Sequence, residues 1–335
     1  MLRVSLSFAL LVRPADLLRW LLALLLAAAS AAAIADTYPS KPVRFIVPYP
    51  PGGVVDLFAR LLADKLPKHL HQPIIVENRP GAGGTIGTAA AASAAPDGYT
   101  ILIGASSQIV FEPLLNPTVS YDVERDLVPV AAIARTPFFL VVDSKLGPRT
   151  ITEFITLVRS KPGAFTYASG GVGTSSNALG ELFKRAAQLD ITHVPYKGDG
   201  QAFTDLLGGH VTAQFITFPV IAEMVRSGRV RALMQTGERR APAAPDVPTA
   251  AEAGYSEVTA YGWSGAFVPA NTPLAVVYRL NTAITQCIAE RDLRQRLVDA
   301  GSELAIGSSQ QFSEFVRSER VKWKKRIKDI GLTVQ

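Results

Sequence analysis

Four short loops rich in glycine, serine and threonine stand where the sequence changes from a strand-like to a helix-like pattern. Backbone N–H groups and the positive dipole end at the start of a helix bind carboxylates and phosphates, and serine and threonine hydroxyls add donors. The pattern therefore predicts an anion-binding cleft. The loops are residues 48–54 (PYPPGGV), 104–108 (GASSQ), 167–177 (YASGGVGTSSN) and 193–198 (HVPYKG).

In the first loop, three prolines precede a glycine pair. Proline fixes φ and has no N–H, whereas glycine lets the backbone approach a ligand closely. We expect Pro51 and its neighbours to hold the strand exit rigid while Gly52 and Gly53 bring N–H donors to a carboxylate. Ser106, Ser107, Thr174, Ser175 and Ser176 are candidate hydroxyl donors in the other loops.

Each loop taken alone is more typical of a helix cap or a tight turn, which also favour these residue types. Asp56 has two roles open to it. In the first turn of a helix a carboxylate complements the dipole and organises the loop, and it is also placed to accept a ligand N–H or hydroxyl. We expect the organising role first, because Asp56 would repel an anionic ligand.

Motifs of enzymes and metal sites are missing from this sequence. G-x-S-x-G, H-E-x-x-H and G-x-x-x-x-G-K-[ST] do not occur, and the glycines at 81–87 are assigned to a turn, with no cofactor. His69 and His71 have no nearby acidic partner in the sequence and do not predict a metal site. A secreted hydrolase pairing a serine of GVGTSSN with His193 is the least favoured alternative, so no catalytic residue is predicted.

Composition indicates an ordinary exported globular protein. The 335 residues are 48% hydrophobic with a formal charge of +6 and no long basic run, which argues against nucleic-acid binding. Residues 1–35 contain an apolar stretch after Arg13 and Arg19 that ends in Ala-Ile-Ala, which predicts a cleaved signal peptide. An uncleaved membrane anchor is the alternative. Cys287 is the single cysteine, so an internal disulfide is excluded.

Strand-like and helical segments alternate from residue 43 onward, which predicts βαβ units and a parallel sheet. Expected strands at 43–47, 73–77 and 99–104 form one lobe, with two further strands at 128–134 and 138–142. A second series begins at Ile151, with strands at 164–168, 191–196, 211–217 and 230–236. The helices after residue 269 have no sheet of their own and are expected to pack back on the first lobe. Two crossings between lobes predict a hinged cleft.

Several of these segments together resemble the Bug-type periplasmic receptors of tripartite tricarboxylate transporters, a family abundant in Bordetella. The resemblance runs from about Tyr38 to the C-terminus. It is carried by YPSKPVRFIVPYPPGGVVDLFAR, ENRPGAGGTIG, APDGYTILIG, YASGGVGTSSN, HVPYKG, LLGGHV, PDVPTAAEAGY and a late W-S-G followed by PANTP.

The resemblance implies a type II periplasmic-binding-protein fold of class α/β, in which two lobes close on a carboxylated solute. It implies lobe 1 at 36–138 and 259–335, lobe 2 at 139–258, and delivery of the solute to the membrane subunits of the transporter. The periplasmic protein is expected to be a monomer. Carried onto this sequence, the ligand contacts are Tyr49, Pro51, Gly52, Gly53, Asp56, Ser106, Ser107, Gly171, Thr174, Ser175, Ser176, Asn177 and Phe218.

Two positions depart from the family pattern. Asn177 stands where the family often has His, and Thr212 stands where it often has Asp. If that acid faces the cleft in the family, its absence here disfavours amino acids as ligands; if it bonds only backbone, ligand choice is unaffected. A ligand-sensing module for a sensor kinase is the alternative function, because it would use the same ligand-driven population shift.

Overall fold

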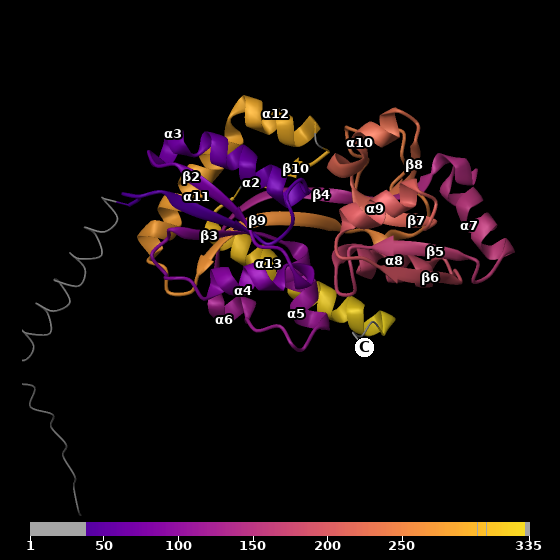
Figure 1. The fold of residues 1–335 in the computed structure, drawn as a ribbon, viewed down its shortest axis with the longest axis horizontal. Helices are drawn as coiled ribbons and strands as arrows, with labels where there is room; N and C mark the ends of the chain where they lie inside the picture. The colour runs from indigo at the N-terminus through magenta and orange to yellow at the C-terminus, as the bar shows by residue number, and fades with distance from the viewer. Residues whose placement is uncertain (1–37, 300, 306, 332–335) are drawn as a thin grey trace, which may run out of the picture.

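The computed structural model describes residues 38–299, 301–305 and 307–331, so the predicted signal peptide at 1–35 lies outside the described residues. Two α/β lobes lie side by side along the long axis and are joined by strands that run between them (Figure 1). Within the described ranges, no helix has the length and apolarity needed to cross a membrane.

The first lobe begins with three parallel strands. β1 (Val43–Val47) lies between β2 (Ile74–Asn78) and β3 (Thr100–Ala105). Parallel neighbours require crossover connections, and helices supply them here as the alternating pattern predicted. The connecting helices are α2 (Val54–Lys65), α3 (Pro67–Leu70), the 3₁₀ turn η1 (Ala82–Gly84) and α4 (Thr85–Ala92).

The second lobe repeats this construction. β5 (Phe165–Ser169) pairs in parallel with β6 (Ile191–Pro195) and β7 (Ala213–Thr217). A fourth strand, β8 (Val230–Gln235), pairs antiparallel with the long strand described next. The flanking helices are η3 (Ser144–Leu146), α7 (Ile151–Ser160), α8 (Ser175–Ala186), α9 (Asp199–Leu207), α10 (Phe218–Arg226) and η4 (Ser256–Val258).

One strand of 17 residues, β4 (Leu127–Asp143), belongs to both lobes. Its first part, as far as Pro137, pairs antiparallel with β9 (Tyr261–Pro269), and its second part, from Phe138, pairs antiparallel with β7 and β8. The prediction of two separate strands at 128–134 and 138–142 was therefore wrong. Pro137 is tolerated because it lies where the pairing partner changes, and the next N–H, of Phe138, donates to the Thr236 hydroxyl at 2.9 Å.

The sheet is mixed, whereas the alternating pattern predicted a parallel one. β9 inserts antiparallel between β3 and β4, which gives the order β2-β1-β3-β9-β4-β7-β5-β6. Because β9 returns to the first lobe from the second, the antiparallel pairing follows from the chain making two crossings.

The C-terminal helices pack on the first lobe, as expected. α11 (Leu274–Ala289) contributes Val276, Leu280 and Ile284 to the core cluster that contains Phe45 of β1. α12 (Arg291–Asp299) and the short strand β10 (Glu303–Leu304) follow, and β10 pairs with β4.

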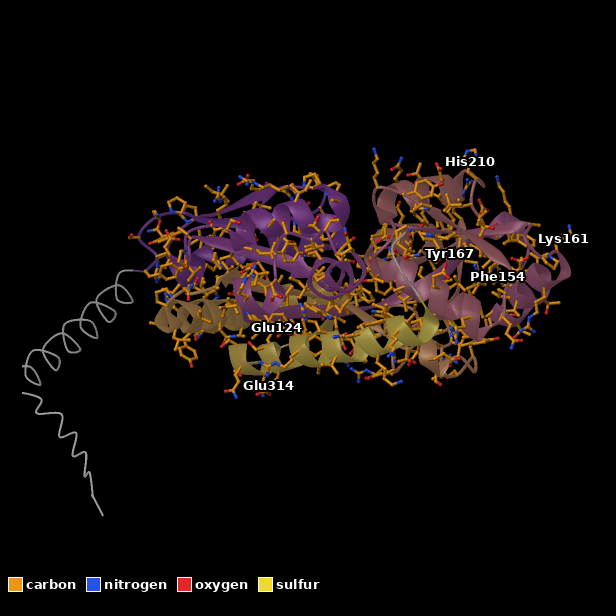
Figure 2. All side chains as sticks on the ribbon, turned by 90° about the horizontal axis from the view of Figure 1, so that it is seen from below. Glu124, Phe154, Lys161, Tyr167, His210 and Glu314 are labelled. Atoms are coloured by element: carbon orange, nitrogen blue, oxygen red, sulfur yellow. The ribbon has the colours of Figure 1, made fainter. Side chains whose placement is uncertain are left out.

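The last helix, α13 (Ser309–Ile330), lies across the lower face of the molecule and reaches the second lobe (Figures 1 and 2). Ser308 and Gln311 form a reciprocal capping box at its start. Trp323 is buried and its ring centroid lies 4.5 Å from that of Phe111. Phe111 belongs to the π-helical turn η2 (Ser107–Phe111), which is followed by α5 (Glu112–Leu115) and α6 (Val123–Asp126).

Candidate functional site

The first predicted loop connects β1 to α2 through a glycine in the left-handed region. Gly52 has φ +88°, a conformation that favours glycine. Gly53 has φ −79° and is the N-cap of α2, without a side-chain cap. A Cβ atom added to Gly53 would meet only the Pro50 carbonyl oxygen, at 3.9 Å. Open space therefore lies in front of the first turn of α2, while Pro51 is exposed at the loop surface.

Asp56 is buried and accepts three hydrogen bonds from the protein. Its Oδ2 accepts from Gly52 N–H at 2.9 Å and from Arg60 Nε at 2.9 Å, and its Oδ1 accepts from Asn78 Nδ2 at 2.9 Å. These contacts give Asp56 an organising role in the loop. The N–H of Gly52 is committed to Asp56, so the expectation that it faces a solute carboxylate is not supported by this geometry.

The pKa of Asp56 reflects two opposing influences. Burial raises the pKa, but the hydrogen bonds from Arg60, Gly52 and Asn78 together outweigh burial and hold the pKa below its usual value. A carboxyl with a lowered pKa in the folded state stabilises the fold above its unfolded pKa of about 3.9. That stability is lost as the pH falls through the lower folded pKa.

We therefore expect Asp56→Ala to destabilise the protein at pH 7 and to have a smaller effect at acid pH, where the folded carboxyl begins to take up a proton. The loss at pH 7 should be about 1 to 3 kcal/mol, because the Gly52 and Asn78 donors lose their acceptor. Urea unfolding at pH 7, 5 and 3 measures the difference from wild type, with the exposed Asp64→Ala on the same helix as control. If the difference in unfolding free energy between wild type and Asp56→Ala stayed constant from pH 7 to 3, the ionised carboxylate would not be what stabilises the loop.

The second loop, after β3, lies close to both Tyr49 and the other lobe. The Tyr49 hydroxyl lies 2.6 Å from the side-chain amide of Gln108. The hydroxyls of Ser106 and Ser107 each lie 3.1 Å from the hydroxyl of Ser175, the first residue of α8. The structure therefore brings together three of the predicted serines, which come from both lobes.

The third loop is shaped by its own hydrogen bonds. Thr174 is the N-cap of α8: its hydroxyl accepts from Asn177 N–H and donates to Gly171 O at 2.7 Å. Asn177 Oδ1 in turn accepts from Gly173 N–H at 3.3 Å. Thr174 and Asn177 therefore fix the loop that carries Gly171, whose φ is +127°.

Ser176 is tied to an acidic residue that the sequence reasoning missed. Its hydroxyl donates to Asp199 Oδ1 at 2.8 Å and accepts from Gly170 N–H at 3.1 Å. Burial raises the pKa of Asp199, and the hydrogen bonds from Ser176, Gly170 and Gln214 partly offset this. Asp199 follows the fourth predicted loop, at the start of α9, and its position in a helix first turn was the available signal.

Two other residues that the sequence analysis singled out, Phe218 and Thr212, have partners away from the three serines that the structure brings together. Phe218 is buried in a core cluster of the second lobe, with its ring centroid 5.1 Å from that of Phe139, so its contact with a solute stays a prediction. The Thr212 hydroxyl accepts from the backbone N–H of Thr166 at 3.2 Å. Because this partner is backbone, Thr212 gives no reason to disfavour amino acids.

The hydrolase alternative paired His193 with a serine of GVGTSSN, and this pairing was wrong. His193 Nε2 lies 2.7 Å from the hydroxyl of Ser169, which precedes that segment. Ser169 is fully buried and its hydroxyl also accepts from Gly171 N–H. Burial lowers the pKa of His193, and its ring stacks on Tyr167. Both side chains therefore contribute to the packing of the second lobe.

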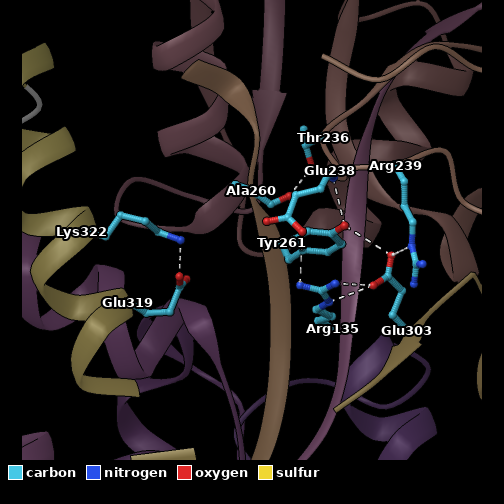
Figure 3. Close-up of polar contacts among 9 residues, drawn as sticks. All are labelled: Arg135, Thr236, Glu238, Arg239, Ala260, Tyr261, Glu303, Glu319 and Lys322. Carbon is cyan, nitrogen blue, oxygen red and sulfur yellow. Dashed lines mark hydrogen bonds and ion pairs between the residues drawn. The ribbon is translucent and has the colours of Figure 1, made fainter. Parts of the chain in front are cut away.

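A separate polar cluster lies where the chain crosses between lobes (Figure 3). Arg135 on β4 donates through Nε to Glu303 on β10 at 2.8 Å and stacks over the Tyr261 ring at 4.3 Å. Arg239 also pairs with Glu303, at 3.5 Å. Arg135, Arg239 and Glu303 border a groove of about 600 Å³ whose lining includes Trp263. None of the predicted site residues lines this groove, so we do not place the predicted cleft there.

Among the residues that the structure describes, no group of three or more His, Cys, Asp or Glu side chains is arranged to hold a metal ion. Cys287 is buried, and burial raises the pKa of its thiol to about 12.

Comparisons with known proteins agree with the resemblance read from the sequence. Residues 58–332 match the family model described as "Tripartite tricarboxylate transporter family receptor". Protein BugT of Bordetella pertussis is 38% identical over 298 residues, which cover 89% of this chain and 91% of BugT.

Solved structures show the same fold. An R. palustris protein solved with adipate has a TM-score of 0.85 and 31% identity, covering 88% of this chain and 99% of that chain. MatC from Rhodopseudomonas palustris, solved with bound malate, has a TM-score of 0.81 and 32% identity. The match covers 87% of this chain and 100% of MatC. The two-lobed α/β architecture is accordingly that of the type II periplasmic binding proteins. The chain belongs to the tripartite tricarboxylate transporter receptor family, as a non-enzymatic, Bug-type periplasmic solute-binding protein.

Proposed function

We propose that this receptor captures a small organic acid between its two lobes and delivers it to a tripartite tricarboxylate-type membrane transporter. The observation that carries the proposal is the meeting of donor-rich loops from both lobes. Ser106 and Ser107 of the first lobe lie within hydrogen-bonding distance of Ser175 at the N-terminus of α8. An anion placed here would receive donors from both lobes at once.

The proposal places the starts of two helices at the solute site. The first N–H groups of α2, after Gly53, and of α8, after Thr174, have no partner within their own helix. A carboxylate that leaves water for this position exchanges its hydration for charge-assisted hydrogen bonds, each contributing about 1.5 to 3 kcal/mol. Closure thus needs only binding energy, and no bond is made or broken.

The proposed contacts divide into two groups. Groups that offer hydrogen-bond donors toward the solute are Tyr49, Gly53, Ser106, Ser107 and Ser175. Groups that hold the loops in shape are Pro51, Gly52, Asp56, Gly171, Thr174, Ser176 and Asn177. Apart from Pro51, which restricts φ, the second group acts through the internal hydrogen bonds described above.

The class of solute, the removal of a leader peptide and the boundaries of the lobes are also proposals. Adipate and malate, found in the two R. palustris relatives, make aliphatic dicarboxylates the first class to test. The segment 1–35 is proposed as a leader removed after Ala35. The lobes are proposed to comprise 36–138 with 259–335, and 139–258, and to close as rigid units.

Thermal-shift screening of ligand-stripped, refolded protein tests the function. The panel contains mono- and dicarboxylates, including adipate, malate, aromatic acids and amino acids. We expect at least one carboxylate to raise the midpoint, because a ligand that binds only the folded state adds RT ln(1 + [L]/Kd) to its stability. Stabilisation by a sugar or an inorganic cation and by no carboxylate would refute the proposal.

A further inference from the structure

Glu112 is a buried carboxyl that the sequence reasoning did not single out and that lies against loops of both lobes. It begins α5, directly after the π-helical turn that starts at Ser107. The residue is 4% exposed. A Cβ atom added to Gly83 of the first lobe would overlap Glu112 Oε1, and one added to Gly173 of the second lobe would lie 3.1 Å from the same oxygen.

These two glycines connect Glu112 to the proposed solute site. Gly173 directly precedes Thr174, the N-cap of α8. Gly83 belongs to the turn η1 before α4, and a Cβ atom on the next residue, Gly84, would lie 3.3 Å from the Tyr49 hydroxyl. Both glycines have positive φ, +64° and +85°, so side chains are disfavoured at both positions and the carboxyl occupies the space between them.

Among the described residues, the groups around Glu112 are acids and phenols, and no cation forms an ion pair with it. The Asn116 side chain is its polar neighbour, and no ion pair among the described residues includes Glu112. Burial raises the pKa values of Tyr49 and Tyr121, and the nearby charge of Glu112 raises them further. Both phenols are therefore neutral at physiological pH. Asp199, on the second-lobe side, accepts a hydrogen bond from the Ser176 hydroxyl. The charge of Arg320 on α13 lowers the pKa of Tyr121, which partly offsets the effect of burial.

We propose that Glu112 belongs to the solute site and carries a proton whenever a carboxylate solute is bound, so that solute capture adds a proton to each Glu112 that is ionised in the free protein. This inference rests on the proposed function and deepens it. A buried carboxylate without a cation would repel an anionic solute, whereas the protonated carboxyl donates a hydrogen bond to it. Burial already raises the pKa of Glu112 to about 7, and a solute carboxylate nearby would raise it further.

The sign of the pH dependence follows from this linkage. If the protonated form binds, affinity is greatest below the pKa of the free protein and falls as the pH rises through it. With a free pKa near 7, affinity at pH 8 should be about tenfold weaker than at pH 6. In Glu112→Gln the amide keeps a hydrogen-bond donor and cannot titrate. We expect this variant to bind with nearly the same affinity at both pH values.

Isothermal titration calorimetry at pH 6 and pH 8 tests the proposal with adipate and malate, and with the most stabilising acid of the screening panel as third titrant. Glu124→Gln is the matched control, because Glu124 is exposed and receives the same substitution. It should behave as wild type. If the pH dependence came from titration of the solute, of His193 or of Asp199, affinity would change between pH 6 and pH 8 by the same factor in wild type and in Glu112→Gln. Equal changes in the two proteins would overturn the assignment of Glu112.

A second measurement uses wild-type protein alone, so that it holds even if the variant does not fold. Binding enthalpies at pH 7.5 in phosphate and in Tris, which differ in ionisation enthalpy, give the number of protons taken up. With a free pKa near 7, about three-quarters of Glu112 is ionised at pH 7.5. Uptake of about 0.8 proton therefore supports the proposal, and uptake near zero overturns it. If none of the three acids binds at either pH, the proposed function fails and this inference fails with it. Tight binding without pH dependence removes only the role of Glu112.

Discussion

Gly53→Val is expected to weaken carboxylate binding by about 100-fold or more while the protein still folds. The added Cβ meets only Pro50 O, at 3.9 Å, and the backbone φ of −79° accepts any L residue. The valine methyl groups would therefore fill the space in front of the first N–H groups of α2, where we place the solute. Loss of one or two charge-assisted hydrogen bonds accounts for about this change in affinity.

Calorimetry with adipate, malate or the best acid from the panel measures the affinity, and urea unfolding measures the stability. Gly53→Ala is the graded control: its single methyl group should reduce affinity less than valine does, and both variants should lose at most about 1 kcal/mol of stability. A folded Gly53→Val protein with wild-type affinity would remove this loop from the site.

Trp323→Ala is expected to give the largest loss of stability, about 3 to 5 kcal/mol. Trp323 is almost fully buried in the core cluster that also holds Phe111, Leu140 and Phe154. Because Phe111 ends the turn that begins at Ser107, the cavity left by the indole lies directly behind a proposed contact loop. Affinity for the solute should fall as well, through displacement of Ser107.

Urea unfolding at pH 7 measures the effect, and Val321→Ala on the same helix is the control. Val321 is 67% exposed, and its truncation should change stability by less than about 0.5 kcal/mol. Equal losses in the two variants would mean that α13 does not hold the core together through its buried face.

Local patterns predicted most of the secondary structure because each lobe alternates short apolar strands with amphipathic helices. The strand at 43–47 was predicted with the bounds that the structure has, and Ile151, where the second series was expected to begin, is the first residue of α7. The long strand β4 was not, because local patterning cannot tell whether Pro137 ends a strand or marks a change of pairing partner. That distinction depends on Tyr261 and Thr217, which are distant in the sequence.

The candidate site stays a prediction, but the loops that form it could be recognised from the sequence. Glycine and hydroxyl residues at strand ends marked the loops, and the first-turn position of Asp56 indicated its organising role. The acids Asp199 and Glu112 were missed because their meaning depends on contacts across the fold. Glu112 reads as an ordinary helix acid until Gly83 and Gly173 are seen on either side of its carboxyl.

The continuity of β4 has a mechanical consequence. At about 3.3 Å per residue, a strand of 17 residues is long enough to run through both lobes as one continuous element, and β9 is hydrogen-bonded along its first part. Movement between the halves is then limited by the bending and twisting stiffness of a sheet, unlike the free swing allowed by a loose tether. The proposed closure of the two lobes would then follow nearly the same path each time, so that little conformational entropy is lost when the contact loops come together.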